Sequence, residues 1–172
     1  GGIVASRSLR IAGDELNQDI IDYARDQFNL LLGERTAEDI KISIGSAKDM
    51  GEKITGPMRG RDLVTGLPKE IIVSDEHIRV ALNKSVHQIV DAVKQTMEET
   101  PPELVADILE KGIVLCGGGA LLKGLDKLIS ESTQTRVHIA DDPLTSVVRG
   151  TGLVLEDLEN LKTVFVPTQF NG

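Results

Sequence analysis

The amino-acid sequence predicts an α/β fold in which helices flank a mixed sheet. Short apolar runs at 113–116 and 137–139 indicate strands, and each is followed by apolar residues at helical spacing. Strands that alternate with helices in this order are typical of an α/β layer. Aromatic residues make up only 2% of the chain, so the core depends on aliphatic side chains, which suits layered helix-and-sheet packing.

The first half of the chain predicts helices and a small antiparallel sheet. Gly33 follows a helical pattern at the usual C-terminal position, and Thr36 with Asp39 resembles a capping box. A turn at 65–68 separates two strand patterns. The expected elements are a strand from residue 3, helices over 14–32 and 36–45, and strands near 53–58 and 70–73.

The second half predicts strands that alternate with helices. Ser74 is a candidate cap, Pro102 fits the first position of a helix, and Asp142 precedes Pro143 as a further cap. Cys116 is expected to be a buried strand residue. The expected elements are helices over 75–82 and 85–99 and from 103, a strand at 113–116, a helix over 120–130, a strand at 137–139 and a helix over 143–161.

Charge and composition narrow the function classes. The net charge is −8, which argues against a nucleic-acid binder, because such proteins carry a basic face. A single cysteine allows no internal disulfide and fits a reducing compartment. No apolar run approaches a membrane span, and no signal segment opens the chain. These observations predict a cytoplasmic protein.

The glycine-rich stretch Gly117, Gly118, Gly119 and Ala120 is the first candidate site. It joins a predicted buried strand to a helix start, and glycines there let a phosphate or nucleotide approach the backbone and the helix N-terminus. A tight turn without a ligand explains the pattern equally well. The stretch is neither a Walker A loop, because no Lys-Ser/Thr pair follows, nor a Rossmann fingerprint, because residue 122 is Leu.

The second candidate site is the helical stretch Glu38, Asp39, Ile40 and Lys41. Glu38 and Lys41 are three residues apart and share a helix face, so they present a carboxylate acceptor and an ammonium donor together. Such a pair could hold the hydroxyls of a ribose and the edge of a base. The alternative is a solvated ion pair. The three histidines lack metal-ligand spacing and no catalytic triad can be assembled, so no catalytic or metal-binding residue is predicted.

Several motifs together resemble the MreB family of bacterial actin homologues, the rod-shape-determining proteins. The resemblance covers about residues 1–160 and rests on 33–38, 59–68, 100–104, 117–122 and 142–145. It implies the C-terminal half of such a protein: the second lobe of an actin-like ATPase (ribonuclease H-like) fold, which is expected to be incomplete. The implied organisation is a core subdomain of 1–13 plus 85–160, an inserted α+β outer subdomain of 14–84, and a loose tail of 161–172.

The resemblance also implies a function. The parent protein would bind ATP, self-associate into filaments and govern rod cell shape by guiding wall synthesis, at the inner face of the cytoplasmic membrane. Residues 38–41 and 117–120 would contact the nucleotide. The phosphate loops, the Mg²⁺ ligands and the catalytic acid would belong to a missing N-terminal lobe, so this chain alone is not expected to hydrolyse ATP.

The resemblance also implies partners for the parent protein. Wall-elongation and membrane-associated proteins would be partners of the parent, with no nucleic acid and no membrane contact through this chain. Two alternatives remain: the nucleotide-binding lobe of a chaperone-type ATPase, or a stand-alone, non-enzymatic interaction domain that keeps the scaffold without the chemistry.

Overall fold

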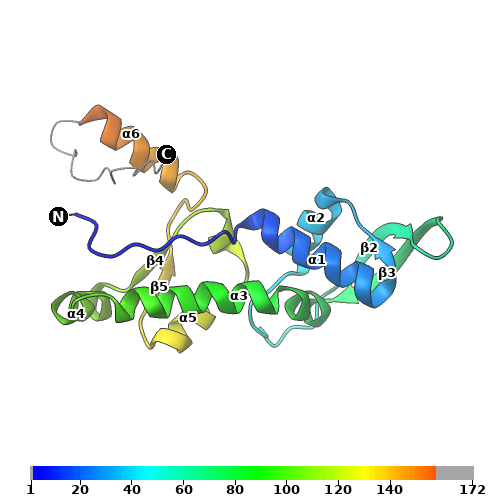
Figure 1. Ribbon diagram of the computed structural model, residues 1–172, viewed down its shortest axis with the longest axis horizontal. Helices are drawn as coiled ribbons and strands as arrows, with labels where there is room; N and C mark the ends of the chain where they lie inside the picture. Colours follow the sequence, from blue (N-terminus) through cyan, green and yellow to red (C-terminus); the bar gives the residue numbers. More distant parts are fainter. Residues whose placement is uncertain (1, 158–172) are drawn as a thin grey trace, which may run out of the picture.

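The computed structural model describes residues 2–157, and its longest element is the helix α3 (Asp75–Glu98). With 24 residues, α3 is about 36 Å long at a rise of about 1.5 Å per residue. Figure 1 shows an elongated molecule with the β2–β3 hairpin at one end of the long axis and α4 (Pro102–Lys111) at the other. Helices and both parallel and antiparallel strand pairs are present, so the predicted α/β fold class is confirmed.

A three-stranded antiparallel sheet confirms the small sheet predicted for the first half of the chain. β2 (Thr55–Asp62) pairs with β3 (Pro68–Ser74), and the short β1 (Leu30–Leu31) pairs with the other edge of β2. α1 (Gly13–Phe28) and α2 (Glu34–Ile44) pack against each other, α1 against β1 and α2 against β2. Both helices therefore pack against the sheet.

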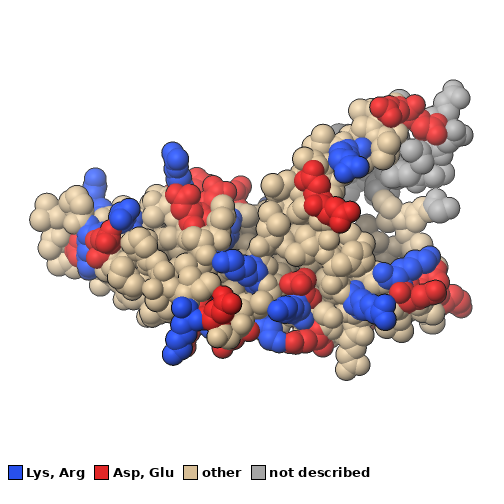
Figure 2. Space-filling model, turned by 180° about the vertical axis from the view of Figure 1, so that it is seen from behind, with Lys and Arg blue, Asp and Glu red and all other residues tan. Residues whose placement is uncertain are grey.

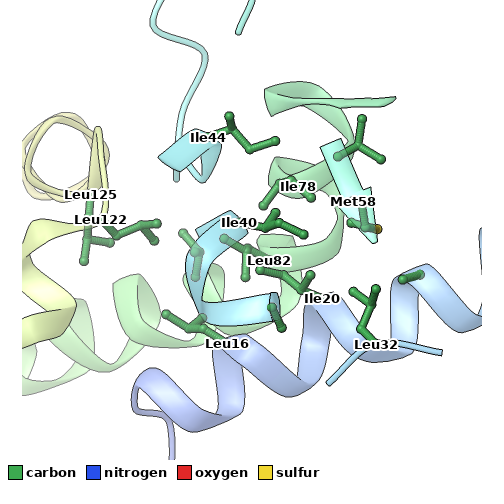
Figure 3. Close-up of a cluster of buried hydrophobic side chains, with 14 of the residues drawn as sticks. Leu16, Ile20, Leu32, Ile40, Ile44, Met58, Ile78, Leu82, Leu122 and Leu125 are labelled. Atoms are coloured by element: carbon green, nitrogen blue, oxygen red, sulfur yellow. The ribbon is translucent and has the colours of Figure 1, made fainter. Parts of the chain in front are cut away.

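The main core lies where α1, α2 and α3 meet the sheet (Figure 3). Ile20, Met58, Ile78 and Leu82 are all 0% exposed. The same buried cluster continues into residues 122–129. The predicted boundary between subdomains at residue 84 falls inside α3, and the division into 1–13 plus 85–160 and 14–84 stays a prediction.

Two helix boundaries in the first half were predicted wrongly. α1 ends at Phe28, because Asn29 adopts the left-handed conformation with φ 50° and its N–H bonds back to the last turn. The chain then enters β1, where Leu30 lies opposite Asp62. α2 begins at Glu34 directly after Gly33, without a side-chain cap, so the capping box expected at Thr36 is absent.

α3 is one continuous helix, where the sequence indicated separate helices over 75–82 and 85–99. The two polar residues between those patterns, Asn83 and Lys84, do not interrupt the backbone hydrogen bonds. The predicted cap at Ser74 is confirmed: its hydroxyl accepts from the His77 N–H, and its own N–H donates to His77 Nδ1 at 3.1 Å.

The second half contains both predicted strands, but the first of them is not buried as predicted. β4 (Ile113–Leu115) pairs in parallel with β5 (Val137–Ile139). Val114 is nevertheless 57% exposed and Cys116 is exposed, because this sheet has only two strands among residues 2–157. The strand expected from residue 3 is also absent, since residues 2–12 form no regular element.

The remaining helices are present with shifted starts. α4 begins at Pro102 as predicted. α5 (Leu125–Thr133) begins later than residue 120, because a 3₁₀ turn, η1 (Gly118–Leu121), occupies that stretch. α6 (Ser146–Glu156) begins after Thr145 and not at Pro143. The predicted end of this helix at 161 and the loose tail of 161–172 lie outside the described residues.

Surface charge is mixed over the described residues. Figure 2 shows acidic and basic side chains interspersed over one face, with no broad surface of Lys and Arg alone. None of the helices within residues 2–157 is both long and apolar enough to cross a membrane.

Asp62 organises the turn between β2 and β3. Its Oδ1 accepts the N–H groups of Val64 and Thr65 at 2.8 and 2.9 Å, and its Oδ2 lies 2.8 Å from Lys69 Nζ. The hydrogen bond from Lys69, followed by those two backbone N–H groups, holds the pKa of the Asp62 carboxyl well below its usual range. The charged form therefore stabilises the folded hairpin.

Acid is expected to remove this contribution. Because the folded pKa is lowered, the contribution of Asp62 is present above the ordinary carboxyl pKa and is lost as the pH falls below about 4 towards the folded value. Asp62→Asn should therefore be less stable than the wild-type chain at pH 7, and this difference should shrink at pH 3. Urea unfolding at both values measures it; a difference independent of pH would contradict the role of the charge.

Candidate functional site

A cavity of about 620 Å³ lies between the start of α1, the helix α2 and the turn η1. We call it the α2–η1 cavity. Glu38, Lys41, Gly118 and Gly119 line it, so the structure brings together four of the eight predicted site residues from two motifs that are distant in sequence. The rest of its lining is mainly apolar: Ile11, Ala12, Gly13, Leu16, Ile42, Leu121, Leu122 and Leu144.

The polar side of the cavity is formed by α2. Glu38 is exposed, and Lys41, one helical turn further on, is half-buried. Lys41 Nζ donates to the backbone carbonyl of Gly13 at 3.0 Å, which fixes the side chain beside the start of α1. An ammonium group carries three N–H donors, so two remain for other acceptors. This side offers one anionic acceptor and one cationic donor.

The glycine-rich turn forms the opposite side. Gly117 follows β4 with a φ of 83°, a conformation that favours glycine, and its N–H donates to the carbonyl of Pro143 at 2.7 Å. A Cβ added to Gly118 would lie 3.6 Å from Leu144 Cδ2, and one added to Gly119 would meet no atom within 4 Å. A ligand can therefore approach the backbone of 118–119 closely.

The other four predicted site residues do not line the α2–η1 cavity. Asp39 is exposed on α2, and its carbonyl accepts from Ser43 Oγ. The Ile40 side chain is 5% exposed and belongs to the core. Gly117 precedes the cavity wall, and Ala120 is buried beside a second cavity of about 570 Å³. These four residues flank the lining residues, and their positions suggest that they shape the backbone of the two motifs.

Sequence reasoning missed the apolar lining of the cavity. Leu122 and Leu144 come from different segments, and Ile42 directly follows Lys41. Leu144 lies within the 142–145 motif, and Leu122 is the last residue of the 117–122 motif. Both residues therefore belong to motifs that were recognised in the sequence. Their part in a cavity becomes visible only when the segments are placed in space.

Comparison with known sequences identifies relatives over nearly the whole chain. A family model described as MreB/Mbl protein matches residues 1–163. The chain is 44% identical over 161 residues to the cell shape-determining protein Mbl of Bacillus subtilis, covering 94% of the chain and 48% of that protein. It is 46% identical over 158 residues to the cell shape-determining protein MreB of Escherichia coli K12, covering 92% of this chain and 46% of that protein.

Solved structures agree with these matches. MreB5 of Spiroplasma citri bound to ADP superposes with a TM-score of 0.87 at 40% identity, covering 94% of this chain and 50% of that one. A MamK double helical filament superposes with a TM-score of 0.73 at 21% identity, covering 87% of this chain and 46% of that one. At this identity the match shows similarity of fold alone. These neighbours confirm the predicted actin-like fold. The chain spans about half the length of the relatives it matches.

Proposed function

The chain belongs to the MreB/Mbl family, and on that premise we propose that it is the adenine-nucleotide-binding part of a filament-forming protein that determines cell shape. The α2–η1 cavity carries this proposal, because it joins the two sequence motifs around one space. MreB5 of Spiroplasma citri, similar to this chain at 40–41% identity, has been solved with ADP and with AMPPNP. The expectation that the chain is the C-terminal half of its protein stays a prediction.

The lining of the cavity suits the adenosine part of a nucleotide. Its volume lies within the usual range for small-molecule sites, and its walls are mostly apolar with few polar groups. Leu122 and Leu144 offer apolar surface to the base. Glu38 accepts hydrogen bonds from ribose hydroxyls, and Lys41 donates to an acceptor of the sugar or base. The 118–119 backbone, without side chains, borders the α-phosphate side.

ATP is the proposed cofactor, and its hydrolysis needs groups beyond this cavity. Phosphoryl transfer requires donors around the phosphates, a metal ion and a residue that positions water. Among the described residues, no three His, Cys, Asp or Glu side chains are grouped so as to hold a metal ion. The proposal concerns nucleotide binding alone and names no Mg²⁺ ligand or catalytic residue. The proposed role of this chain is to bind and orient the nucleotide.

The cellular role follows from the family. The named relatives are cell shape-determining proteins. We propose that this chain belongs to a cytoskeletal protein that assembles into filaments at the inner face of the cytoplasmic membrane and guides wall synthesis with wall-elongation and membrane-associated partners. The alternatives of a chaperone-type lobe and of a stand-alone interaction domain are not favoured, because every match reported above is to MreB, Mbl or MamK.

Blocking the cavity is expected to abolish tight nucleotide binding without unfolding the protein. Gly118 has no left-handed φ, and a side chain there would extend beside Leu144 into the cavity. Overpacking costs about 1–3 kcal/mol, so Gly118→Leu should weaken binding of a fluorescent ADP analogue up to about 100-fold. Lys41→Met, which keeps the stem and removes the charge, should weaken it about tenfold.

The matched control is Lys53→Met, an exposed lysine outside the cavity. Titrations use the native protein that carries this chain, and thermal unfolding verifies that each variant is folded. Wild-type affinity in folded Gly118→Leu would place the nucleotide elsewhere and refute the proposal.

A further inference from the structure

Two hydrogen bonds join the end of α2 and the residues after it to Lys123, which follows the turn η1. Lys123 Nζ donates to the carbonyl of Ser43 at 2.9 Å, and Ala47 N–H donates to the carbonyl of Lys123 at 2.8 Å. Ser46 and Lys123 also form an isolated parallel bridge. We call these four residues the α2–123 junction. It connects two segments that are distant in sequence.

The α2–123 junction lies directly behind both walls of the α2–η1 cavity. Ile42 of α2 and Leu122 at the end of η1 line that cavity from its two sides. Ser43 is the next residue after Ile42, and Lys123 is the next residue after Leu122. The hydrogen bond between Ser43 and Lys123 therefore links the two walls one residue behind their lining, so a change in this bond changes the distance between them.

Close packing is incomplete around the junction. A further cavity, of about 330 Å³, has Ile44, Ser46 and Lys123 among its lining residues. Ile44 also belongs to the same buried cluster as Leu125, so the core contributes to the position of α2 here (Figure 3). Because two cavities border the junction, packing alone leaves the wall separation less restricted than in a filled interior. The hydrogen bonds of Lys123 supply the remaining restraint.

The acceptor of the Lys123 side chain is a carbonyl that the helix itself leaves free. Ser43 lies in the last turn of α2, where carbonyl groups have no partner within the helix. A cation at this end also interacts favourably with the helix dipole. Lys127 lines the same 330 Å³ cavity, but its ammonium has no hydrogen-bond or ion-pair partner within residues 2–157. Of these two lysines, only Lys123 holds α2.

We infer that Lys123 is a positioning residue for nucleotide binding. Its bond to Ser43 holds the two walls of the α2–η1 cavity at the separation that lets one nucleotide contact both. Lys123 does not line this cavity, so it acts without touching the nucleotide. The inference rests on the proposed nucleotide-binding function and adds the element that regulates the width of the site.

This role has a kinetic signature. When only a fraction of the molecules has the binding-competent wall separation, the apparent Kd is the intrinsic Kd divided by that fraction. Loss of the Lys123 bond lowers the fraction, so association slows while the complex, once formed, dissociates at the usual rate. Loss of a residue that contacts the ligand directly acts mainly on the dissociation rate. A change in stability alone alters neither rate of the folded protein.

Lys123→Met in the native protein should raise the Kd of a fluorescent ADP analogue about fivefold through slower association. Lys41→Met should instead raise the dissociation rate, because Lys41 lines the cavity. Lys123→Arg, which keeps a cationic donor, should restore most of the association rate. Lys127→Met is the matched control and should leave both rates unchanged. Stopped-flow fluorescence measures the rates, and thermal unfolding verifies that each variant is folded.

A redox-controlled tether tests the junction independently. Paired strand residues lie about 4.8 Å apart, which is within the range of about 4.4–6.8 Å between the Cα atoms of a disulfide. Ser46→Cys with Lys123→Cys, in a protein with Cys116→Ser and no other cysteines, should associate with the analogue about fivefold faster when oxidised than when reduced. Lys123→Cys without the second cysteine should not respond to oxidation.

An unchanged association rate in folded Lys123→Met would overturn the inference. If that variant does not fold, equal association rates of the oxidised and reduced tether would do the same. Faster dissociation from Lys123→Met at an unchanged association rate would also overturn it, because Lys123 would then contact the nucleotide. In each case the proposed function stands as long as Gly118→Leu and Lys41→Met weaken binding. Wild-type affinity in both of those variants would remove the proposed function and, with it, this inference.

Discussion

Leu82→Ala is expected to lower the free energy of unfolding by about 2–5 kcal/mol. Leu82 is 0% exposed on α3 and belongs to the buried cluster that also holds Ile20, Ile78 and Met58. Truncation removes buried methyl groups and leaves a cavity that close packing cannot fully collapse. The loss is a large part of the total stability of a typical domain.

Val80→Ala is the matched control, because Val80 lies on the same helix and is 58% exposed. Its effect should stay within about 0.5 kcal/mol. Urea unfolding followed by circular dichroism measures both variants. Similar losses for the two would contradict the assignment of Leu82 to the core.

Gly60→Val is expected to cost about 3 kcal/mol and to disturb the pairing of β1 with β2. A Cβ at residue 60 would lie 2.4 Å from the backbone carbonyl oxygen of Leu31 and 3.0 Å from Leu30 Cγ. A backbone atom cannot yield as the end of a side chain can, so β1 must move away. The short strand between α1 and α2 would then lose its hydrogen bonds.

Gly56→Ala in the same strand separates this clash from a general effect of replacing glycine. A Cβ at residue 56 would meet Ile44 Cγ2 at 3.6 Å, an ordinary contact. Unfolding measurements should therefore find a change within about 0.5 kcal/mol. Amide exchange at Leu30 and Leu31 reports on β1 itself, and unaltered protection in Gly60→Val would show that the close approach is not needed.

The candidate site was predictable only in part. Glu38 and Lys41 share a helix face by spacing alone, and three glycines after a strand indicate a close approach of backbone. The structure places both motifs on the α2–η1 cavity, but it turns Ile40 into the core and Ala120 away from the cavity. The spacing of residues in the sequence shows which of them share a helix face. It does not show which of them faces the ligand.

The sequence by itself determined the types of most elements and the family of the chain. Helical spacing, the cap at Ser74, Pro102 at a helix start and the strands near 113–115 and 137–139 are set by local chemistry, which neighbouring residues encode. Tertiary structure alone decided the fusion of α3, the exposure of Val114 and the cavity between α2 and η1. These depend on which surfaces cover one another, and burial is a property of contacts between segments distant in sequence.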